Sequence, residues 1–157
     1  MTDQTYHYTE SGLDNVYLAD GYEFVEAPGG QEVRITDIDG LHEAIGRTLI
    51  ADKKNLSGKE IRFLRHEMLM SQARLAKLLE VGEQTVHRWE KGKAEIPKPA
   101  ETLIRLLYWE HIKDKAASKI RHCLERLADL EDTIDRNRIS LRKSNKGWLS
   151  SLTLEAA

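Results

Sequence analysis

The sequence predicts a mainly α protein with a small antiparallel β meander near its N-terminus and a long helix near its C-terminus. Three observations support this class. Apolar residues recur at helical spacing through much of the chain. Two helical segments are joined by a sharp glycine turn, and the strand-like runs are short and confined to residues 15–36. The 157 residues suffice for one ordinary domain or two small ones.

The N-terminal segment, residues 1–56, contains three short runs of strand-forming residues separated by Asp-Gly and Pro-Gly-Gly turns. These runs are expected to form a three-stranded meander. An amphipathic helix follows to about Asp52, with Thr36 and Asp39 as its capping box, and is expected to cover the apolar face of the sheet. The three runs are residues 15–18, 22–27 and 32–36.

Residues 57–112 are predicted to form a helical domain around a helix-turn-helix. Ser57 and Glu60 form a capping box that begins its first helix. Ser71 caps the next helix, and Gly82 is expected to supply the permissive backbone of the turn. The apolar face of that second helix consists of Leu75, Ala76, Leu78 and Leu79.

The helix after the turn, residues 83–91, has one apolar and one polar side. Val86 and Trp89 are expected to enter the core. In a helix-turn-helix this second helix lies in the major groove of DNA, where its outer side chains contact base edges. The residues expected on the outer face are Gln84, Thr85, His87, Arg88 and Lys91.

Residues 60–107 resemble the Xre/Cro helix-turn-helix family. The resemblance rests on Ser-Gln at the head of the second helix, on LAKLLEV before the turn, and on TVHRWEKGK followed by a proline. It implies a five-helix domain in which Glu83, Gln84 and Arg88 point into the major groove, with Thr85 and His87 assisting. Gln pairs in bidentate fashion with adenine and Arg with guanine.

The same resemblance implies the remaining roles. Arg65 and Glu90 would form an internal ion pair between the first and third helices, rather than contact DNA. The phosphate contacts would be Gln72, Lys91 and Lys93, with Arg74 and Lys77 as further candidates.

Charge is distributed unevenly along the chain, whose formal net charge is −2. Residues 1–58 hold 11 acidic and 4 basic side chains, a net charge of −7, whereas residues 59–98 hold 6 acidic and 9 basic side chains, a net charge of +3. The positive part coincides with the predicted helix-turn-helix, where contact with DNA phosphates requires it. The acidic front suits solvent or a basic protein partner.

Seven apolar residues after the helix-turn-helix recur at intervals of three and four and predict a long helix within residues 113–157. Such a helix fits a homodimer on a palindromic operator, because one recognition helix contacts one half-site. The alternative is a helix folded back on its own domain. Residues 143–157 show no periodicity and are interpreted as a polar tail, in which Trp148 and Leu149 either dock or stay exposed. The seven residues are Ala116, Ile120, Cys123, Leu124, Leu127, Leu130 and Ile134.

A second resemblance covers the front half. SGLDNVYLADGYEF, ITDIDGLHEAIGRTLI and LSGKEIRFLRHEM are similar to the MqsA (YgiT-type) antitoxin family, in which a small zinc-binding N-terminal domain precedes an Xre-like domain and binds a toxin. The resemblance implies the antitoxin of a type II toxin–antitoxin pair, with a cognate toxin or another basic protein bound through residues 1–56. The family's Cys-x-x-Cys pairs are missing and the histidines do not pair at ligand spacing, so no metal and no cofactor are expected.

Several other classes are excluded by the sequence. The single cysteine, Cys123, rules out an intrachain disulfide. No apolar run predicts a membrane span and no signal peptide is evident, so a cytoplasmic location is expected. Neither a nucleophile elbow nor a phosphate-binding glycine loop points to an enzyme. Two functions remain: a sequence-specific repressor, and a protein-interaction module that uses the helix-turn-helix only as a scaffold.

Overall fold

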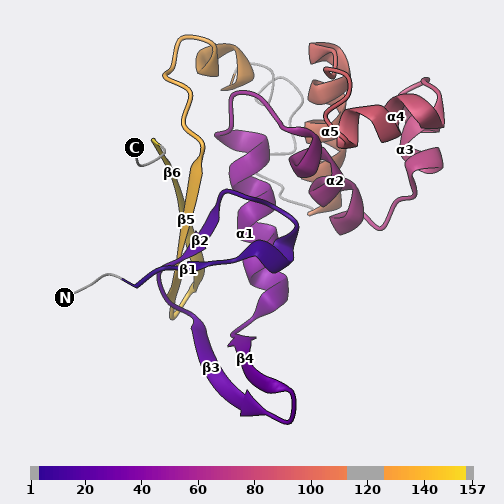
Figure 1. Ribbon diagram of the computed structural model, residues 1–157. Helices are drawn as coiled ribbons and strands as arrows, with labels where there is room; N and C mark the ends of the chain where they lie inside the picture. Colours follow the sequence, from indigo (N-terminus) through magenta and orange to yellow (C-terminus); the bar gives the residue numbers. More distant parts are fainter. Residues whose placement is uncertain (1–3, 113–125, 155–157) are drawn as a thin grey trace.

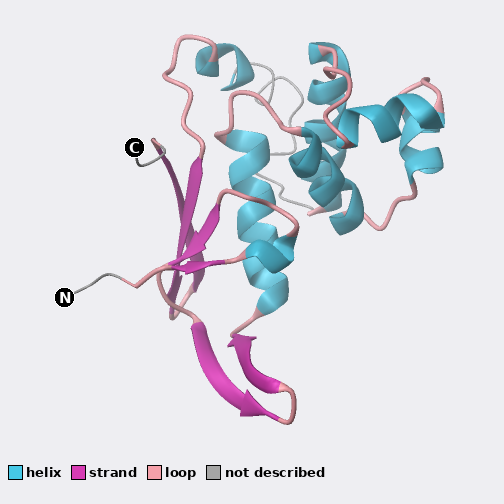
Figure 2. Ribbon diagram, viewed as in Figure 1, coloured by secondary structure: helices cyan, strands magenta, loops and turns pink. Residues whose placement is uncertain are grey.

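A computed structural model describes residues 4–112 and 126–154 of the protein. Its central element is helix α1 (Ile38–Ala51), which separates a sheet from a group of helices (Figure 1). Figure 2 shows the main sheet on one side of α1, most of the other helices on the opposite side, and a two-stranded hairpin beyond one end of α1. α1 contacts both the sheet and the other helices, so it determines how the sheet is placed relative to the helix-turn-helix.

Both ends of the chain build the main sheet. Its strands run in the order β1 (Tyr6–His7), β2 (Val16–Leu18), β5 (Arg138–Ser144) and β6 (Gly147–Thr153). β2 runs parallel to β5, and the other neighbours are antiparallel. The apolar residues of β2 and β5 alternate with polar ones and are almost completely buried in the core that α1 covers. They are Val16, Leu18, Ile139 and Leu141.

The predicted three-stranded meander is wrong in its first strand. β3 (Tyr22–Ala27) and β4 (Gly30–Ile35) form a hairpin, but β2 pairs with β1 and β5 instead. Gly21 allows this separation, because its φ of 78° turns the chain between β2 and β3. A Cβ at Gly21 would lie 2.3 Å from the indole of Trp148. The helix therefore covers the four-stranded sheet, and the β3–β4 hairpin projects away from it (Figure 1).

The C-terminal segment differs from the predicted long helix. Helix α5 (Lys98–His111) ends the helix-turn-helix domain. A short helical stretch follows at residues 126–130, and Ile134 is 69% exposed in an irregular segment. The prediction of one helix running through Ile134 is therefore wrong at its end. The remaining predicted heptad positions Ala116, Ile120, Cys123 and Leu124 lie outside the described residues.

The predicted polar tail is a strand hairpin. β5 and β6 pair from Arg138 opposite Thr153 to Ser144 opposite Gly147. Trp148 docks, because its indole N–H donates to the Asp37 carbonyl at 3.1 Å. Leu149 stays half exposed on the sheet. The hairpin forms because Ile139 and Leu141 alternate with polar residues, a period that matches a strand and not a helix.

Residues 57–112 form four helices and not the predicted five: α2 (Gly58–Glu67), the helix-turn-helix pair α3 (Gln72–Leu78) and α4 (Glu83–Glu90), and α5, which closes the domain. The predicted caps at Ser57 and Ser71 are confirmed, and Ser57 shares a capping box with Glu60. The turn between α3 and α4 differs from the prediction. Glu80 takes the left-handed conformation, with φ of 56°. Gly82 is an ordinary N-cap with φ of −74°.

The start of α1 also differs from the predicted capping box. Asp37, and not Thr36, is the N-cap residue, and its carboxylate accepts a hydrogen bond from the Gly40 N–H at 3.1 Å. The Asp37 backbone has φ of 54°, a conformation that aspartate tolerates better than most residues. The helix still begins where the sequence predicts, since the cap moves by one residue only.

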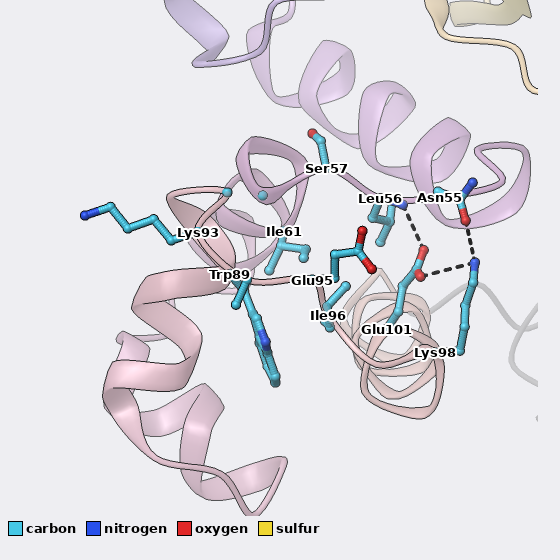
Figure 3. Close-up of a pocket in the computed structure, with 13 residues that line it drawn as sticks. Asn55, Leu56, Ser57, Ile61, Trp89, Lys93, Glu95, Ile96, Lys98 and Glu101 are labelled. Atoms are coloured by element: carbon cyan, nitrogen blue, oxygen red, sulfur yellow. Dashed lines mark hydrogen bonds and ion pairs between the residues drawn. The ribbon is translucent and has the colours of Figure 1, made fainter.

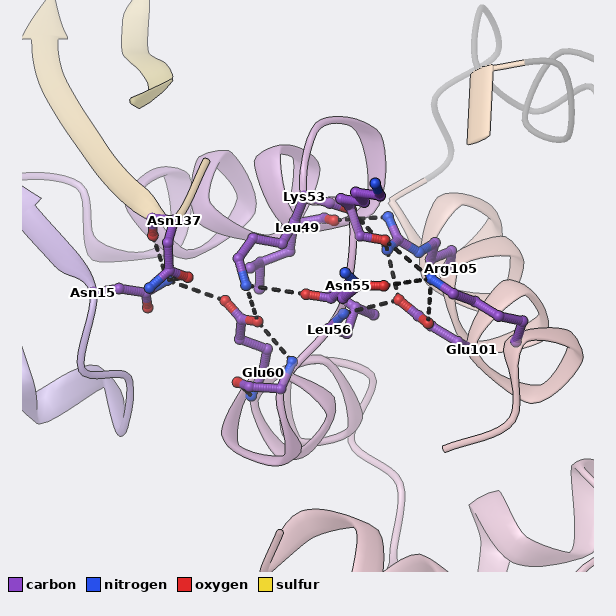
Figure 4. A network of polar contacts seen from close by, with 12 residues as sticks. Asn15, Leu49, Lys53, Asn55, Leu56, Glu60, Glu101, Arg105 and Asn137 are labelled. Carbon is purple, nitrogen blue, oxygen red and sulfur yellow. Dashed lines mark hydrogen bonds and ion pairs between the residues drawn. The ribbon is translucent and has the colours of Figure 1, made fainter. Parts of the chain in front are cut away.

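A buried polar network joins the sheet, α1 and the helix-turn-helix (Figure 4). Arg105 of α5 is 1% exposed and donates to the carbonyls of Leu49 and Ile50 at 3.1 Å. It also donates to the Lys53 carbonyl at 2.7 Å and to Glu101 at 2.7 Å. Arg105 therefore satisfies the carbonyl groups at the C-terminal end of α1, which have no partner within the helix.

Candidate nucleic-acid interface

Helix α4 presents two opposite sides. Val86 and Trp89 are buried against the other helices, as predicted. Gln84 and Arg88 are exposed on the outer side, four residues apart and hence on one face. In the described part of the chain, neither side chain forms a hydrogen bond or an ion pair. Both are therefore free to contact a ligand laid along this face.

The other predicted base-contacting residues flank that pair. Glu83 is exposed in the first turn of α4, whereas Thr85 and His87 are half-buried. His87 lies toward α2 and Lys91 follows one turn later, so these two side chains extend the exposed face toward the C-terminal end of the helix. All five predicted base contacts therefore lie on α4, and of these Glu83, Gln84 and Arg88 are exposed.

Three residues fix α4 relative to α2 and α3. Arg65 donates through Nε to Glu90 Oε1 at 2.5 Å and through Nη2 to Glu90 Oε2 at 3.0 Å. Gln72 donates to the same Oε2 at 2.7 Å, and Arg65 Nη1 donates to the Met70 carbonyl at 2.8 Å. This bidentate, buried pairing holds the end of α4 against the end of α2 and the start of α3.

The electrostatics of this contact favour a charged Glu90. Burial alone would raise the pKa of Glu90, but hydrogen bonds from Arg65 and Gln72 outweigh it and lower the pKa below the ordinary value of 4.5. The carboxylate is therefore ionised at neutral pH and keeps both donors in place.

Gln72 has a role that the sequence does not reveal. The resemblance implies that it binds phosphate, yet its amide nitrogen donates to Glu90. The side chain is half-buried at the first residue of α3. Its carbonyl oxygen and second N–H make no contact among the described residues. The bond to Glu90 therefore makes Gln72 an anchor between the start of α3 and the end of α4, and not a freely mobile side chain.

The other predicted phosphate ligands surround α4 on two sides. Arg74 and Lys77 are exposed on α3, and Lys91 and Lys93 are exposed after α4. None of these four side chains is held in an ion pair within the described segments. They are consequently available as cations on the same half of the domain as Gln84 and Arg88.

A pocket of about 780 Å³ lies where the α4–α5 loop faces the start of α2 (Figure 3). Lys93 extends away from its interior in Figure 3. On the other side, Lys98 donates to Asn55 Oδ1 at 2.6 Å, and Glu101 accepts from the Leu56 N–H at 2.8 Å. The polar groups of Lys98, Asn55 and Glu101 on that side are thus bonded to one another or to the backbone.

A second concavity, of about 630 Å³, lies between residues 9–12 and the helix-turn-helix. We call it the α2 groove. Its cationic and polar lining includes Arg62, Arg65, His66, Gln72, His87 and Lys91. Burial lowers the pKa of His66, and the charges of Arg65 and Arg62 lower it further. His66 is therefore neutral near pH 7, and the positive charge of the groove comes from its arginines and lysines.

One pattern in the sequence indicates a polar surface on α2, although no DNA contact was predicted for it. Lys59, Arg62 and His66 lie three and four residues apart on α2 and so form one exposed row. The contribution of residues 9–12 to the opposite wall has no sequence signal, since it depends on how the sheet packs against α1.

Comparison with known families gives one match, which lies within the helix-turn-helix domain. A family model described as helix-turn-helix matches residues 61–107, from α2 into α5. The match supports a DNA-binding regulator with a helix-turn-helix of the Xre type. No curated protein and no solved structure matches the chain. Among the described residues, no helix is long and apolar enough to cross a membrane.

Proposed function

We propose that the protein is a sequence-specific transcriptional repressor that binds duplex DNA through α4 and acts as a dimer. The observation that carries this proposal is the exposed, unpaired state of Gln84 and Arg88 on one helix face. An amide and a guanidinium are the two groups that make bidentate contacts with adenine and guanine in the major groove. The buried Arg65–Glu90 pair supports the proposal, because it holds that face in a fixed orientation.

The charge distribution is consistent with this orientation. The exposed cations lie beside the base-contacting face, where DNA phosphates can be contacted. Lys91 and Lys93 lie at one end and Arg74 and Lys77 on the neighbouring helix α3. Phosphate contacts of this kind fix the register of the protein on DNA, and the base contacts select the sequence.

A selection from random duplexes tests the function directly. We expect the full chain to enrich a defined sequence and to bind it about 10³-fold or more tightly than unrelated DNA at physiological salt. A dimer predicts two inverted half-sites spaced by about one helical turn, roughly 10 bp. Binding without any enriched sequence would overturn specific readout, and no binding even at low salt would support the scaffold alternative.

The β3–β4 hairpin supports a second candidate function, the antitoxin of a toxin–antitoxin pair. Phe24 is 55% exposed and lies edge-on to Tyr6 and Tyr22, at ring distances of 6.1 and 5.9 Å. A projecting two-stranded hairpin gains little stability by itself. Its exposed acids Glu26 and Glu32 give it a negative surface that suits a basic protein.

Neutralisation of a neighbouring gene product tests this second function. If that product stops growth when expressed alone, we expect co-expression of this chain to restore growth. Phe24→Ser combined with Glu32→Lys should abolish the rescue and leave DNA binding intact. Rescue that is unaffected by both substitutions would remove the hairpin as the toxin-binding surface.

A further inference from the structure

We propose that the α2 groove seats a backbone phosphate of the bound duplex, with Arg62 as its main ligand. The inference rests on the proposed function and deepens it, because it makes the N-terminal segment one wall of the DNA-binding surface. It assigns a phosphate contact to a helix that lies outside the helix-turn-helix pair α3–α4.

The first support is the accessibility of Arg62. It is exposed on α2 and lines the groove. Two neighbouring cations are already occupied, since Arg65 is bound to Glu90 at 2.5 Å and Lys59 to Asp14 at 2.8 Å. Within residues 4–112 and 126–154, Arg62 makes no hydrogen bond or ion pair. Its guanidinium is therefore the cation on α2 that can bind an anion without first losing a partner.

The second support is the continuity between the groove and the base-contacting face. His87 and Lys91 line the groove and also belong to α4. Lys91 lies seven residues after Gln84, close to two helical turns and hence on nearly the same face. A duplex whose major groove receives Gln84 and Arg88 would run one strand past Lys91, which also lines the α2 groove.

The third support is that the opposite wall is held in place. The hydroxyl of Tyr8 is 2.9 Å from Nε2 of His42, and His42 Nδ1 is 2.8 Å from Glu67 at the end of α2. The segment that follows Tyr8 supplies the wall through Glu10, Ser11 and Gly12. Because this chain of contacts joins the N-terminal segment to α1 and α2, the groove keeps its width when a ligand enters.

The ligand is a phosphate and not a metal ion. In the described segments no group of three or more His, Cys, Asp or Glu residues converges as metal ligands would. Of the cations that line the groove, Arg62 and Lys91 have no ion-pair partner among the described residues, and both attract anions. Glu10 on the facing wall accepts a hydrogen bond from the Tyr6 hydroxyl and opposes the entry of a phosphate. Removal of the Glu10 charge should therefore strengthen DNA binding, whereas removal of the Arg62 charge should weaken it.

Salt dependence of DNA binding tests the inference. We expect Arg62→Ala to lower the slope of log K against log salt concentration by about 0.9, equally for specific and unrelated duplexes. Arg62→Lys should retain most of the slope, because it keeps the charge. Glu10→Gln keeps an acceptor for Tyr6 and should tighten binding at low salt, with the gain disappearing at high salt.

Arg34→Ala is the control, since it removes an exposed arginine from the β3–β4 hairpin, none of whose residues line the groove. It should leave the slope unchanged. An Arg62→Ala slope equal to that of the wild type, in a folded variant, would overturn the inference while leaving the repressor function intact. Absence of DNA binding by the wild type would instead overturn the proposed function and this inference with it.

Discussion

The ammonium group of Lys53 lies 2.8 Å from a carboxylate oxygen of Glu60, and both side chains are at most 7% exposed. Glu60 also accepts from the Ser57 N–H at 2.8 Å and from the Asn15 side chain at 3.2 Å. Asn15 in turn donates to the Asn137 carbonyl at 2.7 Å, beside the start of β5. One carboxylate therefore connects the sheet, the end of α1 and the first turn of α2 (Figure 4).

Lys53→Met should be strongly destabilising. The substitution keeps the aliphatic volume but leaves Glu60 buried without its counter-ion, which costs about 3–5 kcal/mol in the free energy of unfolding. Urea denaturation measures this cost. The control is Lys59→Met, which breaks an exposed pair with Asp14 at the same 2.8 Å distance and should cost less than about 1 kcal/mol. Equal costs for the two variants would contradict the assignment of Lys53–Glu60 as the buried junction.

The low pKa of Glu90 predicts how the helix-turn-helix responds to acid. A carboxyl whose pKa is lowered in the folded state contributes stability that is fully present above its unfolded pKa, 4.5. That stability is lost as the pH falls through the lower folded pKa. Glu90→Gln should therefore be less stable than the wild type at pH 7, and the difference should shrink as the pH falls below about 4.5.

Thermal unfolding of both proteins between pH 7 and pH 3 measures that difference. Glu26→Gln, on the β3–β4 hairpin, serves as the control, because Glu26 is exposed and makes no ion pair among the described residues. A Glu90→Gln difference that stays constant across this range would show that ionisation of Glu90 does not stabilise the fold.

Much of the helix-turn-helix could be predicted because its signals are local. Ser57 and Glu60 are three residues apart, and the Ser71 cap and the apolar face of α3 lie within one short segment. The Arg65–Glu90 pair was predicted from a family pattern and is present in the structure. Gly82 misled the prediction, because a glycine near a turn suggested a left-handed backbone that Glu80 adopts instead.

The sheet could not be predicted in the same way. β2 pairs with β5 across more than 120 residues, Val16 facing Ile139, and no local pattern specifies such a parallel partner. The β5–β6 hairpin did leave a signal, since Ile139 and Leu141 alternate with polar residues ahead of an Asn-Lys-Gly turn. The bond from Gln72 to Glu90 and the wall of the α2 groove depend on packing between distant segments, so neither could be predicted from a local pattern.

Gly58→Ala should destabilise the helix-turn-helix. A Cβ at Gly58 would lie 2.3 Å from the Trp89 carbonyl oxygen and 2.8 Å from that of Glu90, so the first turn of α2 would have to move away from the end of α4. Overpacking of this kind costs about 1–3 kcal/mol. Thermal and urea unfolding measure it, and weaker DNA binding should accompany it, because α4 shifts.

Gly29→Ala is the matched control for this substitution. Gly29 lies in the β3–β4 turn, with no atom within 4 Å of an added Cβ and no left-handed φ. It should change the free energy of unfolding by less than about 0.5 kcal/mol. If Gly58→Ala were equally mild, the close approach of α2 to α4 would be wrong.

Arg88 and Lys91 should behave differently when each is replaced by alanine. Arg88 makes no hydrogen bond or ion pair within the described chain and lies on the face that carries Gln84. Arg88→Ala should cost about 1–3 kcal/mol in binding to the selected sequence and relax the preference at one base pair, with little effect on unrelated DNA. Lys91→Ala should weaken binding to all sequences alike and lower the salt slope by about 0.9.

Fluorescence anisotropy with the selected duplex, with single-base variants of it and with unrelated DNA separates the two effects. Both residues are exposed cations on or directly after α4, so each variant controls for the loss of charge in the other. If Arg88→Ala reduced the affinity for every duplex by the same factor, Arg88 would be a phosphate ligand. Base selection would then have to come from the remaining predicted base contacts on α4, of which Gln84 is the one suited to a bidentate contact with a base.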